Sequence, residues 1–281
     1  MRVHIAENAG ACYGVERALN IVLKTAQSAN KQDDIKPVHT LGPLIHNPQV
    51  VSKLEREGVG VADEVDDVHE GTVIIRTHGV PPQITDSLGH KGLSVVDATC
   101  PYVKKVHKSA KKLTEEGYFV IIVGDADHAE VQGIAGYCKD YLVTTSVDDL
   151  VELKLPKKVG VVVQTTQSQE MLDTILCYLS RRVNELRVFN TICEATNERQ
   201  AAARKLSLEV DAMIVIGGKN SGNTRRLYEI SKENCANAHH IETADELKAA
   251  WFEGVSDVGV TAGASTPQAQ ISTVVEAIEN L

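Results

Sequence analysis

One pattern occurs three times in the sequence, and this internal repeat restricts the possible folds more than any other feature. An apolar pair, an Asp or Asn, two further residues and a cysteine occur as VVDATC at residues 95–100 and as VFNTIC at residues 188–193. A longer relative, VHIAENAGAC, occupies residues 3–12. Cys12, Cys100 and Cys193 are therefore equivalent positions in three copies of one unit.

The segments after the three cysteines also repeat. Helical periodicity begins directly after each cysteine, at residues 13–26, 101–113 and 194–206. In the second helix the apolar stripe consists of Val103, Val106, Ala110 and Leu113. The lysines between positions 104 and 112 occupy the other side, which we interpret as a solvated face.

A strand that ends in a glycine loop follows each of these helices, at residues 38–48, 120–131 and 213–224. When the loops are aligned on their glycines, polar residues recur four and six positions later. The aligned glycines are Gly42, Gly124 and Gly217; the fourth residues are His46, His128 and Ser221; the sixth are Pro48, Glu130 and Asn223. A second strand then ends in another polar tip, which carries His78, Thr165 with Thr166, or Ser265.

This alternation of strands and helices predicts an α/β fold of three similar small α/β domains with mostly parallel sheets, arranged around a pseudo-threefold axis. The predicted domains are residues 14–97, residues 98–191, and residues 192–281 together with 1–13. The third unit ends without its last strand, and MRVHIAE at the N-terminus is the natural strand to complete it. Because ligands bind beyond the carboxyl ends of parallel strands, we expect the three cysteines to face one cavity.

Three converging thiolates favour a soft metal centre, either zinc or an iron–sulfur cluster. A structural zinc site requires four ligands, whereas a 4Fe–4S cluster on three cysteines leaves one iron open to a substrate. The loops supply hydrogen-bond donors and helix N-termini that suit an anion. Glu130 is the carboxylate of the set and the candidate general acid.

Simpler interpretations exist for each residue. A single reduced cysteine is usually a small buried apolar residue, and the repeat argues against this only for the three equivalent positions. Cys177 lies in the apolar stretch MLDTILCYL and is predicted to be buried, and His107 is predicted to lie on the surface. Thr165 and Ser265 are equally compatible with helix caps.

Composition excludes several classes of function. A net charge of −9 argues against a general nucleic-acid surface. No apolar run approaches the ~20 residues of a membrane helix, so we expect no membrane association. The N-terminus has no signal peptide pattern, and the six cysteines form no C-x-x-C pair. We therefore expect a cytoplasmic protein with reduced thiols.

Two motifs are incomplete. GGKNSGNT at residues 217–224 has the glycine spacing of a P-loop, but Asn223 occupies the lysine position, which argues against an NTPase. HAE at residues 128–130 matches the H-x-E of zinc deaminases, but no P-C-x-x-C follows.

Over essentially its whole length the sequence resembles the family of 4-hydroxy-3-methylbut-2-enyl diphosphate reductases, which catalyse the last step of the non-mevalonate isoprenoid pathway. The resemblance rests on nine motifs in order: GACYGVERAL, LIHNPQVV, RTHGV, VDATCPYVKKVH, DHAEVQG, QTTQS, NTICEATNERQ, GGKNSGNTRRL and VTAGASTP. It implies a three-domain cloverleaf around a central 4Fe–4S cluster, held here by Cys12, Cys100 and Cys193.

The resemblance also implies the reaction. The alcohol oxygen of an allylic diphosphate binds the free iron, and two electrons and two protons expel it as water, which gives isopentenyl diphosphate and dimethylallyl diphosphate. By resemblance, Glu130 delivers protons and Thr165 orients the alcohol end. The implied diphosphate-binding residues are His46, His78, His128, Ser221, Asn223 and Ser265, with Gly222 at a position where many relatives carry a serine. The implied electron donor is a ferredoxin or a flavodoxin.

Two other functions remain open from the residues alone. An iron–sulfur redox sensor would use the same centre without turnover. A zinc hydrolase or deaminase would use cysteines and His128 as ligands, with Glu130 as the base.

Overall fold

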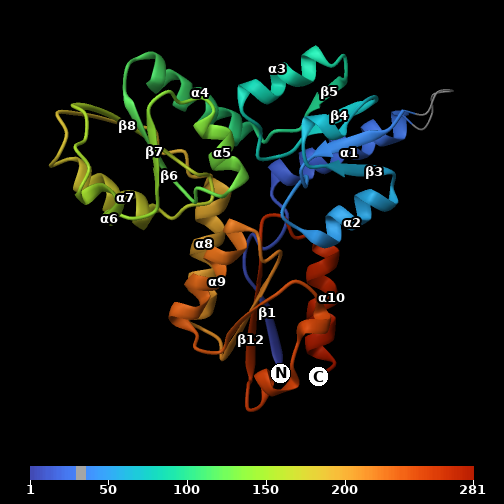
Figure 1. Cartoon of the computed structure of the whole chain (residues 1–281). Helices are drawn as coiled ribbons and strands as arrows, with labels where there is room; N and C mark the ends of the chain where they lie inside the picture. The colour runs from blue at the N-terminus through green and yellow to red at the C-terminus, as the bar shows by residue number, and fades with distance from the viewer. Residues whose placement is uncertain (30–35) are drawn as a thin grey trace. The chain divides into compact units, whose positions relative to one another are not determined.

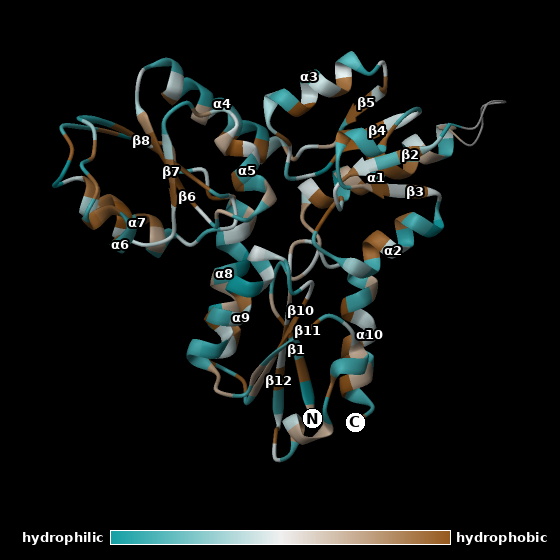
Figure 2. Ribbon diagram, in the orientation of Figure 1, coloured by the Kyte–Doolittle hydropathy of each residue, from teal (hydrophilic) through white to brown (hydrophobic). Residues whose placement is uncertain are grey.

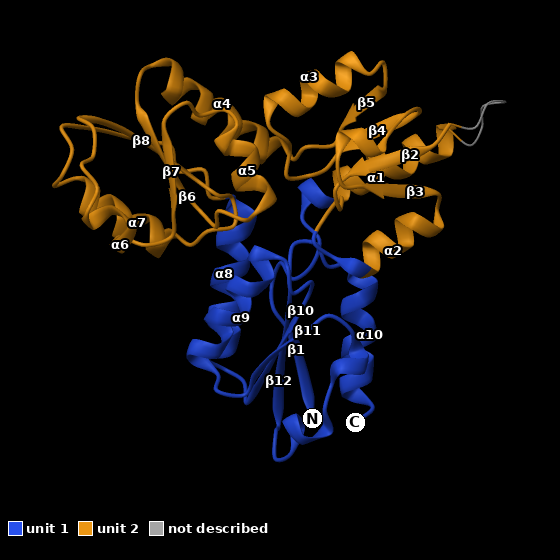
Figure 3. Cartoon of the chain, viewed as in Figure 1, with its two compact units in different colours: residues 1–15, 46–48, 193–281 blue, residues 16–45, 49–192 orange. Residues whose placement is uncertain are grey.

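The computed structural model describes residues 1–29 and 36–281, and its strands form three four-stranded sheets (Figure 1). Every strand pairing in these sheets is parallel, which confirms the predicted α/β class. The chain divides into two compact units (Figure 3), one of residues 1–15, 46–48 and 193–281 and the other of residues 16–45 and 49–192. The predicted boundaries of three domains remain a prediction.

Unit 1 contains one sheet, in the order β1-β12-β10-β11. Its strands are β1 (Arg2–Ile5), β10 (Ala212–Ile216), β11 (Ala238–Ile241) and β12 (Asp257–Ala262). Its helices are α8 (Glu194–Ser207), α9 (Gly222–Asn234) and α10 (Gln268–Glu279), with the short 3-10 helices η2 (Ala244–Glu246) and η3 (Ala249–Phe252). The N-terminal strand pairs with β12 in the register Arg2↔Asp257, so it completes this sheet as predicted.

Unit 2 contains the other two sheets, in the orders β3-β2-β4-β5 and β7-β6-β8-β9. The first consists of β2 (Val38–Leu41), β3 (Val59–Ala62), β4 (Thr72–Ile75) and β5 (Ser94–Asp97). The second consists of β6 (Phe119–Val123), β7 (Tyr141–Thr144), β8 (Lys158–Val163) and β9 (Glu185–Val188). The helices are α3 (Pro82–His90), α4 (Pro101–Glu115), α5 (Ala129–Ala135), α6 (Asp148–Val151) and α7 (Gln169–Leu179), with the 3-10 helix η1 (Val65–Asp67). Two further helices begin in unit 1 and continue here: α1 (Tyr13–Ala29) and α2 (Pro48–Arg56).

Successive side chains of β6 point to opposite faces of its sheet, so alternate residues pack into two separate apolar cores. Val120 and Ile122 pack in a cluster with apolar residues of α4 and α5. Ile121 and Val123 pack in another cluster with residues of α7. A parallel sheet buried on both faces needs near-continuous apolar strands, and Figure 2 shows β6 and β8 in brown. Each fully buried side chain of this size contributes about 1.5–3 kcal/mol.

All three sheets have the same strand order, counted from the edge strands β3, β7 and β11. These edge strands have four residues each and were not expected from the sequence. In the described residues, 1–29 and 36–281, no helix has the length and apolar character that a membrane span requires.

Candidate functional site

The glycine loops directly follow the first inner strand of each sheet, at the carboxyl edge. Gly42, Gly124 and Gly217 come immediately after β2, β6 and β10. Gly217 has a φ of +147°, and a Cβ there would lie 2.7 Å from the hydroxyl oxygen of Thr224. Glycine is therefore required for the tight turn from β10 toward α9.

Two of the predicted anion-binding residues are helix N-caps. His128 precedes α5, and its Nδ1 accepts a hydrogen bond from the Glu130 N–H at 3.1 Å. Because Nδ1 accepts, the ring proton lies on Nε2, which is a donor. Ser221 precedes α9, and its hydroxyl accepts from the Thr224 N–H at 3.3 Å. These side chains fix the loop at the helix start.

Asn223 is 3% exposed, and neither atom of its side-chain amide has a hydrogen-bond partner among the described residues. A buried amide without partners costs about 1–3 kcal/mol in proteins. Gly222 lies beside it as the first residue of α9, where backbone N–H groups have no partner within the helix. The start of α9 therefore has donors for a ligand that the helix itself does not satisfy.

Glu130, in the first turn of α5, and Thr165, in the loop after β8, form a buried pair. Thr165 donates its N–H to Oε1 of Glu130 at 2.7 Å and its hydroxyl to Oε2 at 2.8 Å. Glu130 is 2% exposed, and this burial raises the pKa of its carboxyl to about 7, although both Thr165 bonds favour the ionised form. A carboxyl with this pKa can both hold and release a proton near neutral pH.

Two histidines of unit 2 lie together. The rings of His78 and His128 are 5.4 Å apart between centroids and nearly perpendicular, at 83°. His78 lies in the loop after β4, and His128 at the start of α5. The structure thus brings together the tips of two different sheets within this unit.

Ser265 and His46 are joined within unit 1. The Ser265 hydroxyl donates to the His46 carbonyl at 3.2 Å. The side-chain amide of Asn47 donates to the Ser265 carbonyl at 2.9 Å and to Gln270 at 3.0 Å. Sequence reasoning did not single out Asn47, although its place beside His46 in LIHNPQVV could have drawn attention to it. Neither Ser265 nor Thr165 caps a helix: α10 has Pro267 at its N-cap, and the α7 cap is Ser168.

Each sheet ties its cysteine segment to the neighbouring strand tip. The Cys12 N–H donates to the carbonyl of Ala264 at 3.1 Å, beside Ser265. The Cys100 N–H donates to the carbonyl of Thr77 at 3.0 Å, beside His78. In the third case the bonds lie two residues earlier, where the Thr191 hydroxyl and Val163 backbone pair in both directions. Cys12 and Cys100 are therefore each held beside a polar tip of their own sheet.

The same three cysteines lie at helix starts. Cys100 and Cys193 are the N-caps of α4 and α8, and Cys12 precedes α1 directly. The positive end of a helix dipole favours a thiolate, and all three residues are partly exposed. This donor set fits a metal cluster that takes thiolate ligands.

The other cysteines differ. The Cys138 thiol donates to the Ile134 carbonyl, and burial raises its pKa to about 11. Cys235 is 5% exposed, and burial also raises the pKa of its thiol. Cys177 is exposed on α7, so its predicted burial is wrong. The buried positions of that helix are Leu172, Ile175 and Leu179, one turn apart, and position 177 falls outside this stripe.

Arg199 on α8 links the two cysteine segments of unit 1. Its guanidinium donates to the Gly10 carbonyl at 2.9 and 3.2 Å and to the Ala195 carbonyl at 2.7 Å. The residue is 6% exposed. It thereby fixes the loop before Cys12 against the helix that begins after Cys193. Its place in NTICEATNERQ was the only sequence signal.

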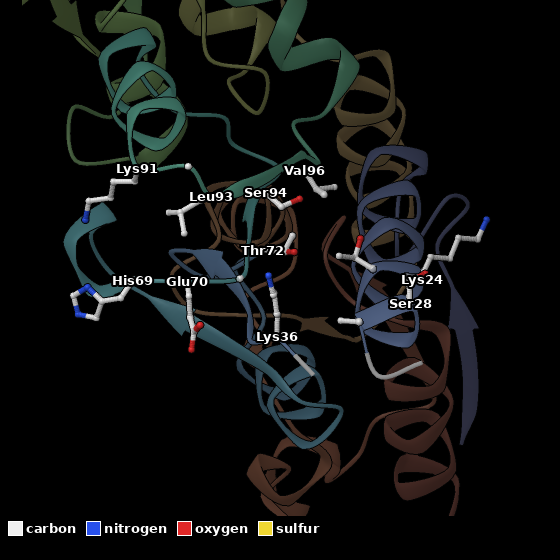
Figure 4. A pocket seen from close by; sticks show the side chains of 14 residues that line it. Lys24, Ser28, Lys36, His69, Glu70, Thr72, Lys91, Leu93, Ser94 and Val96 are labelled. Carbon is white, nitrogen blue, oxygen red and sulfur yellow. The ribbon is translucent and has the colours of Figure 1, made fainter. Parts of the chain in front are cut away.

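Three cavities in unit 2 are lined by none of these site residues. One cavity of about 640 Å³ lies at the amino ends of β4 and β5 (Figure 4). Lys24 and Lys91 line it but point outward in Figure 4, and Lys91 pairs with Asp66 at 2.7 Å. Ligands of parallel α/β sheets bind at the carboxyl ends of the strands, and this cavity lies at the amino ends. We therefore assign no function to it.

Comparisons with known proteins identify relatives over nearly the whole chain. A family model described as LytB protein matches residues 3–279. The 4-hydroxy-3-methylbut-2-enyl diphosphate reductase of Aquifex aeolicus is 49% identical over 282 residues, which cover 99% of this chain and 96% of the relative. The enzyme of the same name from Pelobacter propionicus is 50% identical over 95% of this chain and 94% of its own.

Two solved structures are also similar. One is that of (E)-4-hydroxy-3-methyl-but-2-enyl diphosphate reductase, the terminal enzyme of the non-mevalonate pathway, with a TM-score of 0.72, 47% identity and 99% coverage of both chains. The other is the E-1-hydroxy-2-methyl-but-2-enyl-4-diphosphate reductase of Plasmodium falciparum, with a TM-score of 0.90 and 30% identity over 98% of this chain and 86% of that one.

Proposed function

We propose, because the chain belongs to the LytB family of 4-hydroxy-3-methylbut-2-enyl diphosphate reductases, that the loops described above carry out this reaction. The reaction removes the hydroxyl of an allylic diphosphate as water, with two electrons and two protons, and yields isopentenyl and dimethylallyl diphosphate. It is the terminal step of the non-mevalonate pathway. The family predicted from the sequence motifs is thus confirmed.

Cys12, Cys100 and Cys193 would hold the 4Fe–4S cluster that membership of the family implies. Their equivalent places before α1, α4 and α8 and their partial exposure support this assignment. When bound, the cluster would supply the electrons and a Lewis-acidic iron for the reduction. The pseudo-threefold arrangement of three domains around it is part of the same proposal.

The diphosphate is held by donors at the carboxyl edges of the sheets. The proposed set is His46, His78, His128, Ser221, Asn223 and Ser265, together with the backbone at Gly222. The buried, unpartnered amide of Asn223 is the strongest support, because its Nδ2 could donate a hydrogen bond to an anion at the start of α9. The Nε2 proton of His128 suits the same ligand.

Glu130 supplies protons. The main observation in support is its buried carboxyl group, which Thr165 holds in place by two hydrogen bonds. Its pKa of about 7 keeps a substantial protonated fraction at neutral pH, and the Thr165 hydroxyl contacts it at 2.8 Å. Thr165 orients the alcohol end of the substrate and links it to Glu130. A nearby diphosphate adds negative charge, which raises the pKa of Glu130 further.

The two electrons come from outside the chain. None of the twelve proposed site residues is a reductant, so the cluster must be reduced by a carrier, which we propose is a ferredoxin or a flavodoxin. We do not adopt the alternatives of a redox sensor and a zinc hydrolase. Both carboxylate oxygens of Glu130 are bonded to Thr165, and every relative reported above is a reductase.

The variant Glu130→Gln tests the proton role. Gln keeps the shape and can still bond to Thr165, but it has no proton to transfer. We expect anaerobic turnover with reduced methyl viologen to fall by about 100-fold or more, as is usual for a lost general acid. Substrate should still perturb the visible spectrum of the cluster, because the thiolates and the diphosphate donors are unchanged.

Glu170→Gln is the matched control, because Glu170 is exposed in the first turn of α7. It should keep wild-type turnover. Near-normal turnover of Glu130→Gln would remove Glu130 from the mechanism. Lack of turnover by the wild-type protein carrying its full iron would refute the proposed function.

A further inference from the structure

The three helices that follow the cysteines differ in charge. Glu16 lies in the first turn of α1, and Glu194 lies in the first turn of α8, where negative charge suits the helix dipole. The first turn of α4 has no acidic residue, and Lys104 and Lys105 follow directly. Of the three helices, α4 alone has two basic and no acidic side chains among its first five residues.

Helix stability does not explain this arrangement. Glu115 and Glu116 close α4 at its negative end, where carboxylates are unfavourable. The pairs Lys111–Glu115 at 3.8 Å and Lys112–Glu116 at 3.9 Å have the lysine first, which is the weaker order for such pairs. The lysines near Cys100 thus reduce helix stability and need another reason.

Some lysines of α4 form ion pairs with carboxylates and others do not. Lys104 pairs with Asp97 at 2.6 Å, and the last two lysines of the helix pair with the closing glutamates. Lys105 and Lys108 are exposed, and no carboxylate of the described residues forms an ion pair with either. His107 adds no charge, because burial lowers its pKa to about 4. We call the exposed side chains Lys104, Lys105, Lys108, Lys111 and Lys112 the lysine face.

An apolar groove adjoins the lysine face. The residues that line its cavity of about 350 Å³ include the apolar Val80 and Val95, Tyr137, and the charged Lys104, Lys108, Lys111 and Asp97, of which Asp97 pairs with Lys104. His107 forms part of its wall and stacks on Tyr137 at 4.6 Å between ring centroids. The prediction that His107 lies on the surface is therefore wrong, since it is 6% exposed. Apolar centres with charged rims are typical of protein interfaces.

The lysine face begins next to a proposed cluster ligand. Cys100 caps α4, and Tyr102, two residues later, is 44% exposed. At about 1.5 Å of rise per residue, Lys105 lies roughly 8 Å along the helix axis from Cys100, and Lys108 roughly 12 Å. A protein bound to this face would lie close to the centre that needs electrons.

We propose that the lysine face of α4 and the adjoining groove are the docking site for an acidic electron-carrier protein. The inference rests on the proposed function, which requires an external reductant. The carrier is oxidised by two electrons in all per turnover, and these electrons with two protons convert the substrate hydroxyl to water and place one hydrogen on the product. The chain as a whole carries a charge of −9, so a carrier that is itself acidic needs a local positive surface to approach.

Charge reversal at the two uncompensated lysines tests the docking site. In the holoenzyme Lys105→Glu/Lys108→Glu, we expect the second-order rate of turnover driven by a reduced acidic flavodoxin, or by a reduced acidic ferredoxin, to fall about 10-fold or more at low salt. The Kd of the oxidised carrier, measured by titration calorimetry, should rise by a similar factor. Turnover with reduced methyl viologen should stay within about twofold, because a small dye needs no docking face.

Two controls make the result specific. Lys53→Glu/Lys205→Glu changes the net charge equally at exposed lysines of α2 and α8, and it should leave both carrier assays near wild type. The neutral variant Lys105→Gln/Lys108→Gln should give a smaller loss than charge reversal. The wild-type carrier rate should fall steeply with ionic strength, and the charge-reversed variant should lose most of that dependence.

The outcomes separate the two proposals. Carrier-driven rates and carrier affinity that are unchanged in Lys105→Glu/Lys108→Glu would overturn the docking site, as would an equal loss in the control variant. If the wild-type holoenzyme fails to turn over even with methyl viologen, the proposed function is wrong, and the calorimetric affinity still decides whether the face binds the carrier.

Discussion

The pKa of Glu130 is raised by burial of its carboxyl group, and not by a neighbouring negative charge. The largest cause of its raised pKa is the loss of water around the carboxyl group, and the two bonds from Thr165 act in the opposite direction. The same two bonds fix the position of the carboxyl group. The site therefore places a proton donor accurately and keeps its pKa close to neutral.

This burial predicts a pH dependence of stability. The folded pKa is about 7 and the unfolded value about 4.5, so on raising the pH the unfolded chain releases this proton first. The contribution of Glu130 is fully present below the unfolded pKa and is lost as the pH rises toward 7. The shift corresponds to about 3 kcal/mol. Denaturant midpoints of wild type and Glu130→Gln, measured anaerobically between about pH 4.5 and 7.5, should show this difference, with Gln gaining relative stability at higher pH. A difference that does not change with pH would contradict the assigned pKa.

Among single residues, the sequence identified those that the repeat marks. Glu130 and Thr165 were predicted from aligned offsets, and the structure pairs them. Asn47 and Arg199 were missed, because their bonds to Ser265 and Gly10 join segments far apart in the chain, and no local pattern encodes such bonds. The prediction for Cys177 failed for a different reason. Its helix α7 carries apolar residues outside the buried stripe as well as within it, so an apolar sequence did not show which positions are buried.

At the level of elements, the repeat predicted the inner strands, the glycine loops and the helices after each cysteine. It missed β3, β7 and β11, the edge strands. Each has only four residues, and stretches such as AHHI in β11 have partly exposed polar side chains instead of a continuous apolar run. The strands at the opposite edges, β1, β5 and β9, were predicted because each leads into one of the repeated cysteines.

Arg199 gives a prediction at this level, because it joins α8 to the loop before Cys12. Arg199→Lys keeps the charge but cannot reproduce the fork that binds Gly10 twice and Ala195. We expect iron loss to a chelator, followed by cluster absorbance, to be about 10-fold faster, which is typical for residues that orient metal ligands.

The control for this change is Arg204→Lys, at an exposed position of the same helix. It should lose iron at the wild-type rate. A simple loss of stability would lower the denaturant midpoint of the metal-free protein in proportion, so that midpoint is measured in parallel. Equal iron loss in Arg199→Lys and wild type would show that the Gly10 contact does not position the ligands.

For the molecule as a whole, the repeat predicted three similar parallel sheets, and the structure has three sheets with one strand order. The missing last strand of the third unit predicted that the N-terminal strand completes it, and β1 pairs with β12 in that sheet. The predicted boundaries of the three domains remain a prediction. The cysteines fall in both units, Cys12 and Cys193 in unit 1 and Cys100 in unit 2.

The most direct test of this account is iron and sulfide content after anaerobic reconstitution of single Cys→Ser variants. We predict that Cys12→Ser, Cys100→Ser and Cys193→Ser each retain the cluster at least about 10-fold less well than wild type, because each supplies one ligand. Cys138→Ser, Cys177→Ser and Cys235→Ser should each keep the wild-type iron content. Full iron in any of the first three variants, or loss of iron in Cys177→Ser, would contradict the claim that the repeated cysteines hold one centre.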